Sequence, residues 1–278
     1  MSMRVLGTGA AGSIGTVLCH GLVDRGFDVV GLDLTPAPVG FAGDWFVADC
    51  ADPDAVTAVF AGLHRAGGLD AVVHLAGRPD EAALPDELAS HVVTTAALLD
   101  AMVRYGVARM VYASSNHAVG RTPRTDLLSA DVPPRPDTFY GVAKVAAEAL
   151  LRLYVDRHGL DAVALRIGSF LPKPETRRGL STWLSHDDAV RLVAAALTTA
   201  DPGFAVAYGI SANTRAWWDL EPGRAIGYEP LDDADQFADR IEQQPLSDED
   251  QAEAAHVGGP YATATFERPA LDLAEEPS

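Results

Sequence analysis

This sequence has few lysines, few cysteines and no long apolar run. Its 278 residues include 21 basic and 39 acidic side chains, and the resulting net charge of −18 argues against nucleic acid and anionic membranes as partners. No apolar run approaches the roughly 20 residues that span a bilayer, and the N-terminus lacks the basic region and apolar core of a signal peptide. We therefore expect a cytoplasmic protein that binds small molecules or copies of itself.

The two cysteines and the two lysines are informative because they are rare. Cys19 lies within a helical pattern and Cys50 follows a strand-like run, and neither has a CxxC partner, so we expect reduced thiols. Lys144 and Lys173 are the only lysines. With 48% apolar and 22% charged residues, the composition is that of a globular chain long enough for one large α/β domain over residues 1–278.

Short apolar runs alternate with longer helical patterns over the first 167 residues. The runs, at 4–6, 28–32, 45–48, 71–75, 110–113 and 163–167, are nearly continuous in hydrophobicity and predict strands. Helical spacing recurs at 14–25, 53–66, 91–105 and 142–158. This alternation predicts an α/β fold with a doubly wound parallel sheet of the Rossmann type.

The pattern changes after residue 167. An aperiodic loop precedes a helix predicted over 186–199, which Ser185 should cap while Asp188 closes a capping box. A short helix is expected near 233–242, followed by a tail rich in Asp, Glu, Ala and Pro. We predict a core over about 1–167, a small C-terminal lobe over about 168–265 and a flexible tail at 266–278.

Three glycines at the first strand-to-helix junction form a G-x-x-G-x-x-G pattern. They are Gly9, Gly12 and Gly15 in VLGTGAAGSIG, and the helix that follows directs its amides toward an anion such as a pyrophosphate. Asp33 ends the second strand 18 residues beyond Gly15, where a carboxylate accepts hydrogen bonds from an adenosine ribose and repels a 2′-phosphate. Asp49, ending the third strand, is placed to reach the adenine amine. The core at 1–167 is therefore predicted to bind NAD.

In FYGVAKVAAEAL, Tyr140 and Lys144 are four residues apart on a helical pattern, so both side chains lie on one face. An ammonium beside a phenol favours the phenolate and should lower the pKa of Tyr140 from its ordinary value of about 10. A tyrosine so perturbed can act as a general base.

The run SSNHAVG places Ser115, Asn116 and His117 at the end of a predicted strand. A hydrolase nucleophile would require a G-x-S-x-G turn, and this run has a glycine only at its far end. We interpret Ser115 as a hydrogen-bonding partner of the same reacting group as Tyr140.

Together, the glycine motif, the serine and Y-x-x-x-K resemble the extended short-chain dehydrogenase/reductase family. Within it, SSNHAVG, YGVAK, RIGS, RRGLSTWLSHDD and YGISAN with WWD resemble uronate dehydrogenases. The resemblance implies that Ser115, Tyr140 and Lys144 are catalytic, with Tyr140 as the base. It also implies that the lobe at 168–265 binds substrate, and that no metal is required.

The resemblance further assigns binding residues. For the cofactor NAD they are Gly9, Gly12, Ser13, Ile14, Gly15, Asp33, Asp49, Leu75, Ala76, Gly77, Tyr140 and Lys144. For an acidic sugar they are Ser115, Asn116, His117, Tyr140, Ser169 and Arg178, the last as a clamp for the substrate carboxylate, with Arg78 at the pocket edge.

Two positions depart from the family pattern. Arg78 and Pro79 stand where uronate dehydrogenases have an apolar residue and a serine, which could mean a different acidic sugar or a phosphorylated one. Arg78 could equally face solvent or pair with Asp80 or Glu81. His91 stands where many relatives carry asparagine.

The implied reaction is oxidation of a cyclic hexuronate, glucuronate or galacturonate, at its anomeric carbon to an aldarolactone with NAD. Three alternatives stay open: a sugar-phosphate dehydrogenase of the glucose-6-phosphate type, an NDP-sugar epimerase or dehydratase, and a non-catalytic NAD sensor, which would be expected to have lost Tyr140 or Lys144. Relatives usually self-associate, so a homo-oligomer is expected.

Overall fold

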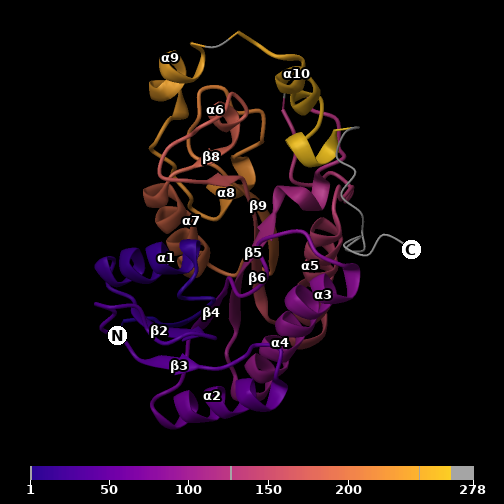
Figure 1. Ribbon diagram of the computed structural model, residues 1–278. Coiled ribbons are helices and arrows are strands. Elements are labelled where there is room, and N and C mark those ends of the chain that lie inside the picture. The colour runs from indigo at the N-terminus through magenta and orange to yellow at the C-terminus, as the bar shows by residue number, and fades with distance from the viewer. Residues whose placement is uncertain (1, 126, 244, 264–278) are drawn as a thin grey trace, which may run out of the picture.

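A seven-stranded parallel sheet forms the centre of the molecule in the computed structural model, which describes residues 2–125, 127–243 and 245–263 (Figure 1). The strand order is β3-β2-β1-β4-β5-β6-β9. The strands are β1 Arg4–Thr8, β2 Asp28–Asp33, β3 Trp45–Val47, β4 Ala71–His74, β5 Arg109–Ser115, β6 Asp161–Ile167 and β9 Phe204–Gly209. The order reverses between β1 and β4, which is where doubly wound sheets form a ligand crevice. The predicted fold class is confirmed.

Helices cover both faces of this sheet. They are α2 Pro53–Arg65, α4 Thr94–Tyr105 and α5 Phe139–His158 on one face, and α1 Ser13–Asp24 and α7 His186–Thr198 on the other. The first group of helices contributes Phe60, Leu98 and Leu151 to one apolar core, and the second contributes Leu18 and Val193 to the other. Because both faces are covered, the strands are apolar on both sides, which explains their continuous apolar runs in the sequence.

Short elements after β6 form the C-terminal lobe at the top of Figure 1. They are β7 Ser169–Phe170, which pairs with β8 Trp183–Leu184, the helices α6 Gly179–Thr182, α8 Glu221–Ala225, α9 Ala238–Ile241 and α10 Asp248–Ala254, and 3-10 turns at Ala234–Phe237 and Gly259–Ala262. Trp217 and Trp218 are buried with Tyr208 and Val257 in the apolar core of this lobe. The predicted tail at 266–278 lies outside the described residues.

Two elements of the observed fold differ from the sequence pattern. No strand is predicted over FAVAYG, yet these residues form β9 on β6, so the sheet also draws on the segment beyond residue 167. Alanine and glycine are weak strand formers, and the pairing with β6 supplies what the local sequence lacks. The helix predicted from His91 begins earlier, because α3 (Leu84–Leu88) continues through a π-helical turn at Ala89–Val93 into α4.

The N-terminus of α7 is capped in part as predicted. Ser185 Oγ accepts a hydrogen bond from the amide of Asp188 at 2.9 Å. The prediction that Asp188 closes a capping box is wrong, because its carboxylate accepts instead from the amides of Leu231 and Asp232. A tertiary contact with the lobe thus replaces a local one.

Two further features bear on the sequence predictions. Cys19 and Cys50 are buried free thiols, as predicted. Among the described helices, none has the length and apolar character needed to cross a membrane.

Candidate active site

The glycine loop between β1 and α1 borders a cavity of about 750 Å³ at the carboxyl edge of the sheet. Gly9 has a φ of +66°, and a Cβ there would lie 2.7 Å from the amide nitrogen of Ala76. A Cβ on Gly15 would lie 2.2 Å from the carbonyl oxygen of Gly9. The loop therefore packs closely against both the segment after β4 and the start of α1, and only glycine fits at either position. This packing leaves the amino end of α1, at Gly12 and Ser13, on the cavity wall, where its amides favour an anion.

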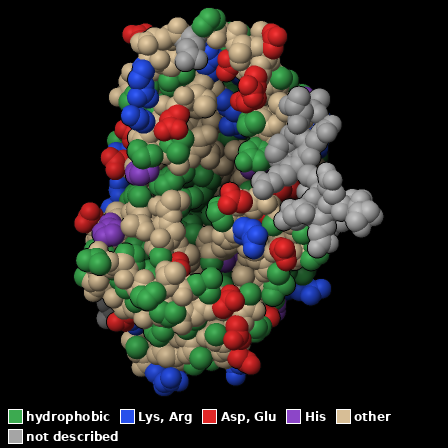
Figure 2. All heavy atoms as spheres, in the orientation of Figure 1, with side chains coloured by type: hydrophobic (Ala, Val, Ile, Leu, Met, Phe, Trp, Pro, Cys, Tyr) green, Lys and Arg blue, Asp and Glu red, His purple; other side chains and the backbone are tan. Residues whose placement is uncertain are grey.

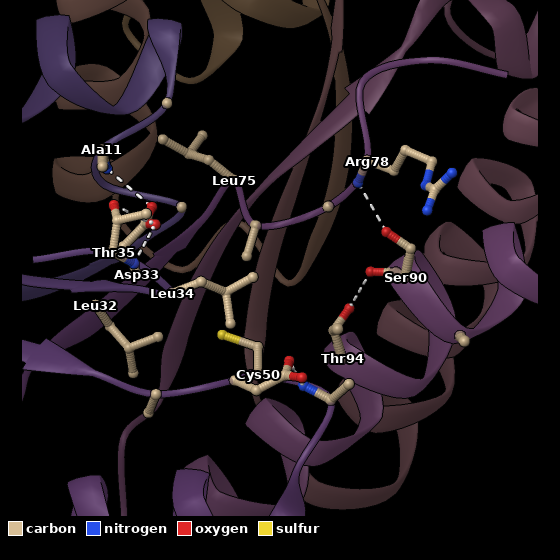
Figure 3. Close-up of a pocket in the computed structure, with 18 of the residues that line it drawn as sticks. Ala11, Leu32, Asp33, Leu34, Thr35, Cys50, Leu75, Arg78, Ser90 and Thr94 are labelled. Atoms are coloured by element: carbon tan, nitrogen blue, oxygen red, sulfur yellow. Dashed lines mark hydrogen bonds between the residues drawn. The ribbon is translucent and has the colours of Figure 1, made fainter. Parts of the chain in front are cut away.

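Acidic side chains also line this cavity. Asp33 Oδ2 accepts a hydrogen bond from the amide of Ala11 at 2.9 Å, and its Oδ1 accepts from the amide and hydroxyl of Thr35, both at 3.1 Å (Figure 3). Asp33 is thus held rigidly between the glycine loop and the segment after β2. Asp49 also lines the cavity and accepts from the amide of Ala51 at 2.8 Å. A carboxylate fixed at this position suits the hydroxyls of an adenosine ribose.

A second cavity of about 320 Å³ shares Gly9, Gly12, Leu75, Gly77 and Arg78 with the first. Of the remaining predicted residues, its wall contains Ser13, Ile14, Gly15, Ser115, Tyr140 and Lys144, while Ala76 lines the first cavity. Figure 2 shows a hollow near the centre of this face, with hydrophobic side chains in it. The paired cavities suit a dinucleotide whose two halves meet at the glycine loop.

The carboxyl end of β5 and the first turns of α5 supply the second cavity with its reactive groups. Thr138 caps α5 by accepting from the amide of Gly141 at 2.9 Å. Lys144, 5% exposed, extends from α5 to donate to the carbonyl oxygen of Ala113 in β5 at 2.7 Å. Its Nζ lies 5.2 Å from the ring centroid of Tyr140. The predicted juxtaposition of Tyr140, Lys144 and the end of β5 is present in the structure.

The electrostatics of this pair differ from the sequence prediction. Burial raises the pKa of Tyr140 to about 12, a hydrogen bond with Ser115 lowers it, and the charge of Glu87 raises it. Burial lowers the pKa of Lys144 to about 7, against the raising effects of Glu87 and Glu148. The expected net lowering of the Tyr140 pKa is therefore wrong for this structure, because burial disfavours the phenolate and is the largest effect on this pKa.

Four of the predicted sugar-binding residues lie outside the wall of the second cavity. Asn116 donates to the carbonyl oxygen of Ile167 at 3.4 Å, and His117 Nδ1 lies 3.0 Å from both carboxylate oxygens of Asp137. Asn116 Oδ1 is buried without a hydrogen-bond partner.

The other two, Ser169 and Arg178, are linked through Thr182. Thr182 Oγ1 lies 3.0 Å from Ser169 Oγ and accepts from Arg178 Nη1 at 3.2 Å. Arg178 Nη2 also donates to the carbonyl oxygen of Val257, and its Nε is buried without a partner. Burial lowers the pKa of Arg178 to about 10, so the guanidinium stays charged near neutral pH.

Arg78 is an exposed residue on the loop after β4, at the junction of the two cavities. Its amide donates to Ser90 Oγ at 2.7 Å (Figure 3). Glu81, which the sequence offered as a partner, instead accepts from the amides of Phe139 and Tyr140 at the start of α5. No ion pair among the described residues includes Arg78, which agrees with the alternative that it faces solvent.

Asp137 and Thr182 are neighbours of the predicted site that no sequence pattern indicated. Each contacts a predicted site residue by a hydrogen bond, and no spacing motif in the sequence predicts such contacts. Within the described part of the chain, no group of three or more His, Cys, Asp or Glu side chains is arranged to hold a metal ion.

Comparisons with known proteins agree with this geometry. Residues 5–178 match the model of the NAD dependent epimerase/dehydratase family. A uronate dehydrogenase of Pseudomonas syringae pv. tomato is 36% identical over 267 residues, covering 94% of each chain. An NAD-dependent glucose-6-phosphate dehydrogenase of Haloferax volcanii is 35% identical over 271 residues, covering 89% of this chain and 100% of the other. The crystal structure of uronate dehydrogenase from Agrobacterium tumefaciens matches with a TM-score of 0.86 at 37% identity, over 97% of this chain and 98% of that chain. This chain belongs to the NAD dependent epimerase/dehydratase family.

Proposed function

We propose that this chain oxidises a cyclic hexuronate, such as glucuronate or galacturonate, at the anomeric carbon to the aldarolactone with NAD. The observation that carries this proposal is the position of Tyr140, Ser115 and Lys144 on the wall of a cavity that adjoins the glycine-loop cavity. Similarity to uronate dehydrogenases over nearly the full length of the chain supports the substrate class.

The glycine loop and Asp33 would hold the pyrophosphate and adenosine ribose of NAD, and Lys144 the nicotinamide ribose. When bound, NAD accepts the hydride that leaves the anomeric carbon. Tyr140 Oη takes the proton of the anomeric hydroxyl, and Ser115 Oγ holds the same oxygen in position. The positive charge of Lys144 would stabilise the phenolate, so the reaction requires the charged lysine and the ionised tyrosine together.

The substrate carboxylate would bind Arg178. Its buried Nε has no partner, and an unsatisfied cationic donor is costly unless a ligand accepts from it. Ser169, linked to Arg178 through Thr182, would hold a sugar hydroxyl, as would Asn116 and His117. Asp137 fixes the ring of His117 through Nδ1, which leaves Nε2 for the sugar.

A sugar phosphate is the second candidate substrate, favoured by Arg78. This residue adds a guanidinium without an ion-pair partner among the described side chains at the edge of the cavity. It is a suitable ligand for a phosphate, and the similarity to a glucose-6-phosphate dehydrogenase supports this alternative.

An absorbance assay of NADH formation with hexuronates, hexose phosphates and NDP-sugars separates the candidates. We expect NADH from glucuronate or galacturonate and none from NDP-sugars, whose epimerases recycle the cofactor within one turnover. Turnover of glucose 6-phosphate without any uronate would overturn the first proposal in favour of the second.

A Tyr140→Phe variant tests the assigned base. We expect its kcat to fall by at least about 100-fold, because general-base catalysis contributes 10²–10⁴-fold. NAD binding, measured by calorimetry, should change little, since the hydroxyl is not required to form the glycine-loop site. A variant that retained full activity would show that Tyr140 is not the base. Self-association and a cytoplasmic location remain predictions, which light scattering and fractionation would test.

A further inference from the structure

Glu87 is a fully buried acidic residue beside the second cavity. It lies in α3 with 0% of its surface exposed, and neither carboxyl oxygen has a well-formed hydrogen bond. Burial raises its pKa, while the Ala82 amide, Arg78 and Lys144 partly offset that effect. A buried carboxyl with so few hydrogen bonds stays ionised only where a positive charge lies nearby.

His91 holds this carboxyl beside the catalytic tyrosine. Its Nε2 lies 3.3 Å from Glu87 Oε2 and 3.1 Å from the carbonyl oxygen of Arg78, so Nε2 must carry a proton. The imidazole packs edge to face on the ring of Tyr140, with the centroids 5.1 Å apart. Burial lowers the pKa of His91 to about 3, so at neutral pH the imidazole is uncharged and does not neutralise Glu87.

Lys144 is a buried cation without an ion-pair partner among the described residues. Its Nζ donates to the carbonyl of Ala113, and none of the ion pairs among the described residues includes it. Glu148, the other buried carboxylate near it, is already occupied. Arg166 donates to both of its oxygens, at 3.0 and 2.8 Å, and Ser114 Oγ donates to Oε1 at 2.5 Å.

We propose that Glu87, held in place by His91, is a positioning residue that provides the buried counter-charge of Lys144 and, by its own negative charge, controls the ionisation of both Lys144 and Tyr140. The geometry supports this because α3 and the π-helical turn both pack on α5, the helix that carries Tyr140 and Lys144. The catalytic consequence rests on the proposed function, whereas the pairing of charges does not.

The charged and titratable groups around Glu87 come from five elements. They are Arg78 and Glu81 in the loop after β4, His91 in the π-helical turn, Tyr140, Lys144 and Glu148 in α5, His74 in β4 and Tyr112 in β5. His74 is uncharged at neutral pH because burial lowers its pKa to about 3, and burial also keeps Tyr112 protonated. Glu81 is engaged by the two amides at the start of α5. Glu87 is therefore the carboxylate best placed to balance Lys144.

The presence of only two lysines makes a direct test practical. In the full-length protein labelled with ¹³C at lysine Cε, Lys144 gives one of two signals, and the exposed Lys173 serves as an internal reference. We expect the Lys144 signal to titrate near pH 7 in the wild type. In Glu87→Gln its midpoint should fall by at least about half a pH unit, because loss of a nearby negative charge disfavours the ammonium.

Two further variants control this measurement. Glu87→Leu removes the same charge and replaces a poorly bonded carboxyl by an apolar side chain, so it should fold even if the amide variant does not. It should show the same downward shift. Glu229→Gln removes one charge from an exposed position and should leave the Lys144 midpoint unchanged. An unchanged or raised midpoint in a folded Glu87 variant would overturn the proposal.

The pH profile of kcat/KM gives a second readout that a purely structural role would not produce. Without the Glu87 charge, both the phenol of Tyr140 and the ammonium of Lys144 should lose their protons at lower pH. Both limbs of the profile in Glu87→Gln should therefore move toward acid, with little change in the KM for NAD. An inactive wild type would refute the proposed function and leave the lysine titration as an independent result, whereas limbs that stay in place would refute the role of Glu87.

Discussion

Replacing Glu148 by glutamine should destabilise the protein severely. Glu148 is 6% exposed and Arg166 is 3% exposed, and Arg166 donates two hydrogen bonds to the Glu148 carboxylate, at 3.0 and 2.8 Å. In Glu148→Gln the buried guanidinium of Arg166 loses its counter-charge, which typically costs about 3–5 kcal/mol. For 278 residues, the entropy of unfolding is roughly 0.6 kcal/mol/K, so a loss of about 4 kcal/mol corresponds to a Tm lower by roughly 7 °C.

A double-mutant cycle separates the pair from its surroundings. Arg166→Met alone leaves Glu148 buried and unpaired, with a similar cost, whereas Glu148→Gln with Arg166→Met buries no charge and should be more stable than either single variant. Thermal unfolding at pH 7, followed by circular dichroism, gives the Tm of all four proteins. A Tm lower by less than about 2 °C in Glu148→Gln would contradict this prediction, as would a double variant whose loss of Tm equals the sum of the two single losses.

Two further predictions concern the glycine loop and Lys144. Gly15→Ala places a methyl group 2.2 Å from the carbonyl oxygen of Gly9, so the loop must shift and the Kd for NAD should rise at least about tenfold. Calorimetry with NAD measures this, and an unchanged Kd would contradict the assigned site. Because the pKa of Lys144 falls to about 7 on folding, the unfolded chain binds more protons than the folded one between about pH 7 and 10.5. The wild type should therefore gain up to about 1.4 kcal/mol of stability per pH unit relative to Lys144→Met over that range. Urea unfolding of both proteins at pH 7 and 9 checks this, and a difference that does not vary with pH would refute it.

The strand and helix pattern was predictable because each βα unit has a local signature. Buried parallel strands are apolar on both faces, and the helices repeat at a spacing of three and four residues. The exception is β9, whose sequence FAVAYG is a weak strand former that depends on its pairing with β6. The short elements of the lobe were mostly not predictable for the same reason, since helices of four or five residues are stabilised by their surroundings.

The same distinction between local sequence signals and tertiary contacts applies to the candidate site. The glycines and Asp33 were recognisable because the strand, turn and helix that carry them are contiguous in the sequence. Tyr140 and Lys144 were recognisable as a pair on one helical face. Their environment was not, because Glu81, Glu87 and His91 lie at least 49 residues away in the sequence and carry no motif of their own. Burial then reversed the expected direction of the pKa of Tyr140.

The sequence by itself determined the fold class, the glycine loop and the identity of the reactive side chains, because each depends on residues close together in the chain. Tertiary structure alone decided which charges lie near those side chains and how far water is excluded from them. The spacing of Tyr140 and Lys144 places them on one face of any helix that contains them. Their ionisation, however, depends on burial and on Glu87, which comes near them only because α3 and the π-helical turn pack on α5.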